Sequence, residues 1–117
     1  MKTLFLFTAL SLFSYSNSEM ETLYLKNACN SCHGMYGEGM GTAPRLQGVQ
    51  EHRLLRRLKE LQQGKIRSPS GAVMISFAKT LDENQTKEMA KYLSNLKTKV
   101  DDDRYIQAYD RAGDGGS

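Results

Sequence analysis

Two cysteines and one histidine stand at a spacing that could do chemistry. Cys29 and Cys32 are the only cysteines of the chain, and His33 follows the second of them directly. This CxxCH pattern is the attachment signature of a c-type haem. On one turn of helix the two thiols can reach the two vinyl groups of one porphyrin, while the imidazole points at the iron. We therefore expect Cys29 and Cys32 to anchor a haem and His33 to ligate its iron.

Three other uses of these residues have less support. A structural zinc site needs four ligands, and beyond the motif the only remaining imidazole or thiolate is that of His52. A redox-active cysteine pair is typical of a βαβ pattern, and the sequence does not alternate strand and helix. A disulfide between the two cysteines would close a very small loop and stabilise little. The motif therefore favours haem attachment.

The N-terminal segment has the pattern of an export signal. An apolar run over residues 4–13 is followed by Ser16 and Ser18, small residues placed for a cut before Glu19. Such a segment is typical of a secretory signal peptide, and the run is too short to span a bilayer as a helix. Since haem attachment takes place outside the bacterial cytoplasm, we predict a signal peptide over residues 1–18 and a periplasmic location in a Gram-negative bacterium. An uncleaved membrane anchor is the alternative; after cleavage we expect no membrane span.

Composition predicts one small domain with a thin protein core. Removing residues 1–18 from the 117 leaves 99, the length of one small domain. Loss of Lys2 lowers the formal charge from +3 to +2, too little positive charge to indicate nucleic-acid binding. The chain has no tryptophan, and three of its four phenylalanines lie in the predicted signal peptide. A buried porphyrin would supply the missing apolar surface. We therefore predict that the chain without haem is largely unfolded.

Hydrophobic periodicity predicts an all-α chain with three main helices. Apolar residues recur at helical spacing over residues 19–29 and again over residues 50–63, where Gly64 provides a stop. Asp82 and Gln85 form a capping box at the start of a third helix, whose buried stripe comprises Met89, Ala90, Leu93 and Leu96.

Three segments are predicted to be irregular. Residues 34–41 contain four glycines, but no strand precedes them and no lysine-serine pair follows, so we interpret them as a tight wrap around a haem edge rather than a phosphate loop. Residues 68–80 are interpreted as a loop between two helices. Residues 98–117 are polar and glycine-rich, which predicts a mobile or loosely docked tail.

The sixth iron ligand decides whether such a site carries electrons or reacts with a small molecule. A methionine thioether would stabilise ferrous iron and raise the potential. Met74 lies 41 residues after His33, inside residues 68–80, where a loop could cross the other haem face. A bis-imidazole site with His52, or an open site, are the alternatives. The other methionines either lie on apolar helical stripes or follow the histidine too closely; they are Met20, Met35, Met40 and Met89.

The second predicted helix has a basic face. Between residues 45 and 67, seven lysines or arginines stand against two glutamates, a local balance of +5. This face is either a solvated helix surface or a docking surface for an acidic partner. The residues that would dock are Arg53, Arg56, Arg57 and Lys59.

The order and spacing of these motifs resemble those of the class I cytochromes c, specifically the small single-haem kind of the bacterial periplasm. The resemblance covers most of residues 19–96. Its matching positions are Cys29 to Gly34, Gly37 to Gly39, Pro44 to Gly48, Met74, Ala78, Leu81, Asp82, Tyr92 and Leu93.

The resemblance implies a cytochrome c fold over residues 19–97, in which three to four helices surround one covalently bound haem c and the first and last helices cross. It also implies that the carbonyl of Pro44 accepts a hydrogen bond from His33, and that Met74 is the second axial ligand. Such a bond fixes the imidazole ring and raises its basicity. Arg45 is either a partner of a haem propionate or a plain surface residue.

We therefore expect a carrier of one electron between redox proteins of a respiratory chain, which is not itself an enzyme. With both axial positions filled, no substrate reaches the metal. Two alternatives stay open. One is a haem-bearing subunit that is permanently docked to an oxidoreductase, and the other is a haem enzyme or gas sensor with an open sixth site.

Overall fold

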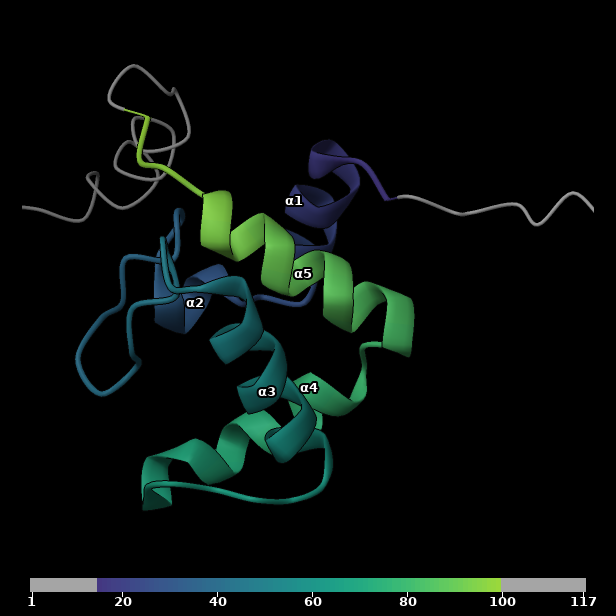
Figure 1. The fold of residues 1–117 in the computed structure, drawn as a ribbon. Helices are drawn as coiled ribbons and strands as arrows, with labels where there is room; N and C mark the ends of the chain where they lie inside the picture. Colours follow the sequence, from purple (N-terminus) through teal and green to yellow (C-terminus); the bar gives the residue numbers. More distant parts are fainter. Residues whose placement is uncertain (1–14, 100–117) are drawn as a thin grey trace, which may run out of the picture.

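The structure, a computed structural model, describes residues 15–99, and this part of the chain is helical (Figure 1). Its only β-contact is an isolated bridge between Met40 and Ala43. The all-α prediction is confirmed. The helices are α1 (Asn17–Lys26), α2 (Asn30–His33), α3 (Glu51–Gln62), the 3-10 helix η1 (Pro69–Val73), α4 (Met74–Lys79) and α5 (Glu83–Asn95).

The first and last described helices cross, as the resemblance implies. In Figure 1, α1 lies behind the upper half of α5. Met20 and Tyr24 of α1 belong to the same buried cluster as Ala90 and Leu93 of α5. The rings of Tyr24 and Tyr92 pack at a tilt of 56°, with centroids 6.3 Å apart. This apolar contact between distant parts of the chain forms the centre of the core.

Helix α1 begins and ends earlier than the sequence predicts. It starts at Asn17 because the side chain of Ser16 accepts a hydrogen bond from the backbone N–H of Glu19, while the Glu19 carboxylate accepts from the N–H of Ser16. It ends at Lys26, and Ala28 takes a left-handed conformation with φ 58° before α2. Since the capping serine precedes the predicted cut before Glu19, the prediction of a helix over residues 19–29 missed this start.

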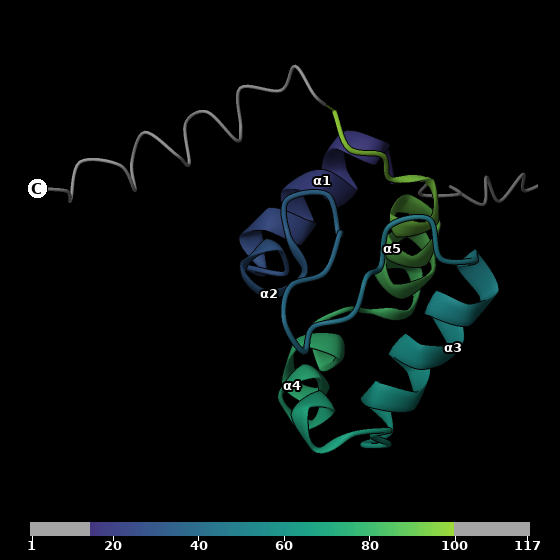
Figure 2. The same ribbon diagram turned by 90° about the vertical axis from the view of Figure 1, so that its left-hand side faces the viewer.

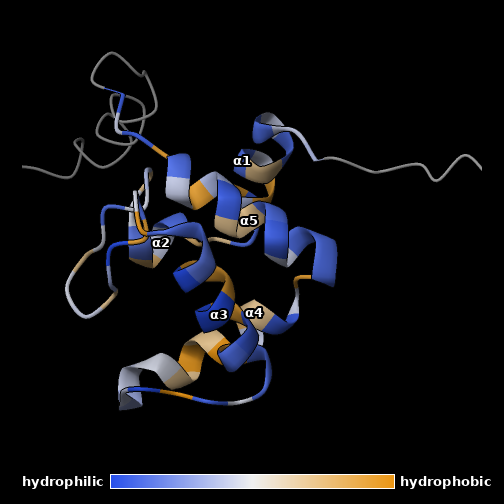
Figure 3. Ribbon diagram, viewed as in Figure 1, coloured by the Kyte–Doolittle hydropathy of each residue, from blue (hydrophilic) through white to orange (hydrophobic). Residues whose placement is uncertain are grey.

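The two longer helices match their predictions closely, except that Leu96, predicted in the buried stripe of the third helix, lies just beyond the end of α5 and is only half-buried. Helix α3 lies within one residue of each predicted end, and Gly64 takes the left-handed conformation with φ 79° just beyond it. Helix α5 begins with the predicted capping box, in which the Asp82 carboxylate accepts from the N–H of Gln85 at 2.7 Å. Figure 3 shows hydrophilic residues along much of the outer side of both helices.

The prediction of an irregular loop over residues 68–80 was wrong, because this segment forms η1 and α4. Pro69 stands at the start of η1, where its fixed φ suits a helix and its missing N–H costs nothing. Ala78 is buried in α4, which packs on α3. Two short helices thus replace the expected loop. Pro69 and the burial of Ala78 favour helix here, although the segment lacks the long apolar stripe that predicts a helix from sequence.

The glycine-rich segment folds back on the chain that follows it. Gly39 has φ +87°, and a Cβ at this position would lie 2.8 Å from the backbone nitrogen of Arg45 and 3.0 Å from the carbonyl oxygen of Ala43. The carbonyl of Gly37 accepts hydrogen bonds from the N–H groups of Leu46 and Gln47. Here glycine allows close approach between two backbone segments.

The remaining sequence predictions for the ends of the chain concern residues outside the described range. Residues 1–14 of the predicted signal peptide and residues 100–117 of the predicted tail fall in this category. Among residues 15–99, no helix is long and apolar enough to cross a membrane.

Candidate functional site

The CxxCH motif follows directly on α1 and forms its own helical turn. The N–H of Cys29 donates to the carbonyl of Tyr24 at 3.1 Å, and the N–H of His33 donates to the carbonyl of Cys29 at 3.0 Å. Both Cys29 and Cys32 are free thiols, the first half-buried and the second exposed. Burial raises the pKa of the Cys29 thiol. The backbone therefore fixes both thiols and the imidazole relative to α1.

The imidazole of His33 is buried, and one of its nitrogens is already bonded. His33 is 4% exposed, and its Nδ1 lies 2.8 Å from the carbonyl oxygen of Pro44. Because a carbonyl can only accept, Nδ1 carries the proton and Nε2 keeps a lone pair that is free to bind a metal. The bond fixes the orientation of the ring. The structure thus places Pro44 where the resemblance implies.

A largely apolar cleft lies beside the motif. It contains about 420 Å³ of empty space, including space that is open to solvent. Figure 2 shows the helices that contribute to it: α4 lies below α2 and to the left of α3. The lining residues come from all five α-helices and the loops between them: Tyr24, Asn27, Cys29, His33, Leu46, Leu58, Met74, Phe77, Ala78, Leu81, Met89 and Leu93.

The cleft brings His33 together with two methionines, Met74 and Met89. Met74, the first residue of α4, lines it together with His33, whereas His52 is an exposed residue of α3 outside the lining. Met20 and Met89 are buried, as predicted, although Met89 also lines the cleft. Met40 is 56% exposed on the glycine-rich loop. Of the two side chains considered for the sixth position, only Met74 shares the cleft with His33.

The expected wrap of the glycine-rich segment around a haem edge does not appear in the cleft lining. None of the lining residues lies between Gly34 and Arg45, and the close approach at Gly39 is to backbone. The segment acts instead through Pro44, because its turn returns the chain to the Nδ1 of His33.

Tyr24 of α1 makes a contact beside the motif that the helical spacing over residues 19–29 does not predict. Its hydroxyl donates to the carbonyl oxygen of Gly34 at 2.6 Å, so it ties α1 to the residue after His33. Burial, and after it the neighbouring Cys29, raises the pKa of Tyr24 above its ordinary range. A tyrosine five residues before the first cysteine was the available signal, since a buried hydroxyl needs a partner.

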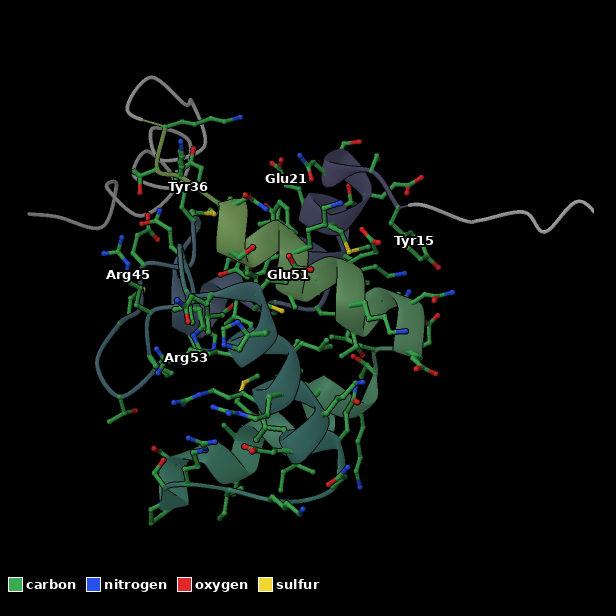
Figure 4. All side chains as sticks on the ribbon, in the orientation of Figure 1. Tyr15, Glu21, Tyr36, Arg45, Glu51 and Arg53 are labelled. Atoms are coloured by element: carbon green, nitrogen blue, oxygen red, sulfur yellow. The ribbon has the colours of Figure 1, made fainter. Side chains whose placement is uncertain are left out.

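The guanidinium of Arg45 is bonded within its own loop. It donates to the carbonyl of Gln47 at 3.2 Å and to the Gln47 side-chain oxygen at 2.6 Å, and Gln47 in turn donates to the hydroxyl of Thr98 at 2.8 Å. Arg45 and Arg53 lie on the same side of the molecule in Figure 4. Thr98, at the start of the predicted tail, is thus hydrogen-bonded to the domain.

The other interpretations of the cysteine pair find no match here. Over residues 15–99, no group of three or more histidine, cysteine, aspartate or glutamate side chains could hold a metal ion, as a zinc site would require. The same range contains no βαβ unit of the kind in which redox-active cysteine pairs occur.

Comparison with known proteins decides between the classes that use CxxCH. The family model described as cytochrome c matches residues 19–97. The chain belongs to the cytochrome c family. It is therefore a haem electron carrier that acts with redox protein partners, and its cofactor is covalently attached haem c.

Three bacterial cytochromes c show how far the likeness extends. The chain is 31% identical to cytochrome c-554(547) of Halothiobacillus neapolitanus over 85 residues, which cover 66% of this chain and 92% of that protein. It is 31% identical to cytochrome c-553 of Nitratidesulfovibrio vulgaris over 74 residues, 62% of this chain and 72% of the relative. It is also 35% identical to cytochrome c-552 of Acidithiobacillus ferridurans over 69 residues, 59% of this chain but only 29% of that protein.

The residues around the cleft fit haem c. Two free thiols stand on one helical turn, a buried imidazole keeps Nε2 free, and a thioether lines the same cleft. Most of the other lining side chains are apolar, as a porphyrin requires. The donor set of imidazole nitrogen and methionine sulfur is one that proteins use to hold haem iron.

Proposed function

We propose that this cytochrome c is a single-haem carrier in which Cys29 and Cys32 form the thioether bonds, His33 and Met74 are the axial ligands, and Pro44 orients the histidine. One observation supports this assignment above the others. The imidazole of His33, bonded at Nδ1 to Pro44, and the thioether of Met74 line the same apolar cleft.

In this proposal, the chain itself holds and insulates the redox centre. When bound, haem c supplies a one-electron ferric–ferrous couple. His33 would hold the iron through Nε2, while the Pro44 carbonyl keeps the proton on Nδ1. Met74 would supply the sulfur ligand, which favours the ferrous form. Apolar residues such as Leu58 and Leu93 exclude water from the cleft.

We place the carrier in the periplasm as a link between redox proteins of a respiratory chain. The predicted signal peptide over residues 1–18 and the CxxCH chemistry support this location. The cytochrome domain comprises residues 19–97. With both axial positions occupied by its own side chains, the chain performs no catalysis of its own.

Optical spectra of the purified protein test the ligand assignment. We expect a low-spin, six-coordinate reduced form that does not bind carbon monoxide. Met74→Ala should abolish the methionine-to-iron charge-transfer band at the red end of the visible spectrum. Met40→Ala, which changes an exposed methionine, is the control and should leave the band intact. A band that survives in Met74→Ala would refute the ligand, and ready carbon monoxide binding by the unchanged protein would favour an enzyme or sensor.

We further propose that the basic face of α3 docks the acidic partner. This face consists of Arg53, Arg56, Arg57 and Lys59, which are exposed. Within residues 15–99, none of the four forms a salt bridge. Leu58 of the same helix lines the cleft, so the basic face lies on the outer side of a cleft wall. Unpaired positive charge at this place would steer an acidic surface toward the haem.

Ionic strength tests the docking face. We expect the bimolecular rate of electron transfer with an acidic redox protein to fall as salt rises, because charges beyond about 8 to 10 Å are screened at 0.10 to 0.15 M. Replacing Arg56 and Arg57 with glutamine should lower the rate at low salt and flatten its salt dependence. Lys87→Gln and Lys91→Gln on α5 form the charge-matched control. Equal losses in both double variants would assign the effect to net charge rather than to α3.

A further inference from the structure

The residues that surround Met74 in sequence give it little anchorage of their own. No residue of η1, which precedes it, is buried, and Val73 is 62% exposed. Within α4 only Ala78, at 1% exposed, is buried. The position of Met74 at the start of α4 therefore depends on how the far end of that helix is held.

The far end of α4 is held by Gln62, in the last turn of α3. Its side-chain N–H group donates to the carbonyl oxygen of Ala78 at 2.9 Å and, more weakly, to that of Leu81 at 3.4 Å. It also donates to the hydroxyl oxygen of Thr86 at 2.9 Å. One amide group thus contacts the end of α4, the turn after it and the first half of α5.

The acceptors of Gln62 are themselves fixed. Thr86 is 1% exposed, and its hydroxyl donates to the carbonyl of Asp82 at 2.6 Å, which leaves its oxygen free to accept from Gln62. Ala78 is equally buried. Loss of the amide would leave the buried Thr86 oxygen without this donor, whereas the Ala78 carbonyl would still accept from the N–H of Leu81 at 3.2 Å. An acceptor that is left buried without a donor costs more than the loss of an exposed hydrogen bond.

A second contact from the same turn of α3 reaches the other side of the Met74 segment. Glu60 accepts hydrogen bonds from Arg67 through both carboxylate oxygens, at 3.1 to 3.3 Å. The Arg67 side chain is 53% exposed and that of Glu60 is 27% exposed, so this pair is the weaker of the two attachments.

We propose that Gln62 is a positioning residue that holds Met74 at the iron by tying the end of α4 to α3. The proposal rests on the proposed role of Met74 as axial ligand. Gln62 is absent from the cleft lining, so it acts through the backbone of α4 rather than by touching the haem. Its loss should make release of the thioether easier and leave the attachments through Cys29, Cys32 and His33 in place.

Competition with imidazole measures this release. In the ferric holoprotein, added imidazole breaks the bond between iron and the Met74 sulfur and forms a bond to its own nitrogen, with no change of oxidation state. We expect Gln62→Leu to bind imidazole about five- to tenfold more tightly, as the loss of one partly buried hydrogen bond predicts, and to raise the saturating rate of displacement. Gln63→Leu, which changes the exposed neighbouring glutamine, should match the unchanged protein.

Two further variants separate positioning from general instability. Met20→Ala removes a buried side chain of α1 outside the cleft lining, so it should lower resistance to urea without changing imidazole affinity. Arg67→Gln should tighten imidazole binding by about twofold or less, since its ion pair is partly exposed. If Gln62→Leu does not retain haem, Gln62→Asn takes its place, because it keeps the amide but withdraws it by one methylene.

The outcomes are distinguishable. Imidazole affinity in Gln62→Leu or Gln62→Asn equal to that of Gln63→Leu would overturn the positioning role, as would an equal tightening in Met20→Ala. A charge-transfer band that is present in the unchanged protein and survives in Met74→Ala would overturn the ligand assignment itself. The proposal is supported if Gln62→Leu shows the charge-transfer band without imidazole and loses it at a lower imidazole concentration than Gln63→Leu does.

Discussion

The two sides of the haem cleft are held in different ways. On the attachment side, backbone hydrogen bonds join α1 to the CxxCH turn, and the buried His33 is bonded to the Pro44 carbonyl. On the methionine side, Met74 follows an exposed 3-10 helix, and side chains from the end of α3 hold its helix. The attachment side is therefore part of the core, whereas the methionine side is connected to the core by side-chain contacts from α3.

This difference suggests which part of the site can open. Local opening needs little free energy where few apolar residues are buried and where contacts are exposed. Those conditions hold for η1 and α4 and fail for α1, whose Met20 and Tyr24 are buried. We expect perturbations of the attachment side to affect the whole fold, and perturbations of the methionine side to affect ligation first.

The largest effect should follow from removing the covalent attachments. The double variant Cys29→Ser, Cys32→Ser should retain no covalent haem and be largely unfolded, because the protein core is small without the porphyrin. Met74→Ala should keep its haem and unfold cooperatively. Far-UV circular dichroism during thermal and urea unfolding measures both. A haem-free chain that melts cooperatively with native helix content would remove the contrast between the two sides.

A smaller effect is expected from the loop that carries Pro44. Gly39→Ala should lower the free energy of unfolding by roughly 2 to 4 kcal/mol, from left-handed strain together with overpacking. The added Cβ would lie 2.8 Å from the Arg45 nitrogen and displace the backbone next to Pro44. A shift in reduction potential should accompany the loss, because the bond to His33 tunes the ligand.

Gly41→Ala is the matched control for the loop. Gly41 also has positive φ, at +56°, but a Cβ there would meet nothing within 4 Å. It should therefore cost about 1 to 2 kcal/mol from strain alone and leave the potential unchanged. If Gly39→Ala and the unchanged protein have the same reduction potential, the conformation of this loop does not tune the His33 ligand.

Tyr24→Phe should have the next largest effect on the attachment side. It removes the donor to the Gly34 carbonyl, at a cost of about 1 to 3 kcal/mol in the free energy of unfolding. Because the pKa of Tyr24 is raised above 10.0 in the folded chain, the unfolded state loses this proton first and binds fewer protons at high pH. Stability should therefore fall as the pH rises above about 10, and less steeply in Tyr24→Phe. Identical slopes in urea titrations of both proteins would contradict this.

The sequence predicts the attachment side better than the methionine side, for a physical reason. CxxCH encodes its chemistry within one helical turn, and the capping box and stripe of α5 are equally local. Residues 68–80 have no long periodic stripe, so helix formation there depends on Pro69 and on burial of Ala78 against α3. Such burial is decided by packing between distant segments, which a single sequence does not show.

The hydrogen bonds that position the site divide in the same way. The bond between His33 and Pro44 was implied by the resemblance alone, since no spacing rule predicts that a carbonyl 11 residues away will face an imidazole. Gln62 lies next to another glutamine in a polar stretch, and nothing local distinguishes the half-buried Gln62 from the exposed Gln63. The roles of side chains that act through tertiary contacts cannot be recognised from the residues next to them in the sequence.

The smallest effect should come from the two capping boxes, which lie on opposite sides of the comparison. Asp82→Ala removes the cap of α5, next to the acceptors of Gln62, and should lower the free energy of unfolding by about 1 kcal/mol. Ser16→Ala should have no effect on the mature protein if the signal peptide is cut before Glu19, because the cap of α1 then leaves with it.

Mass spectrometry of the exported holoprotein decides the second half of this prediction. A mature chain that begins at Glu19 has lost the Ser16 cap, so the first turn of α1 must be held by Met20 and the core alone. A mature chain that begins before Ser16 would keep the cap, contradict the predicted cut and make Ser16→Ala as costly as Asp82→Ala. In that case, the attachment side would carry a capped helix as well as a covalent anchor, and its difference from the methionine side would be greater than we infer.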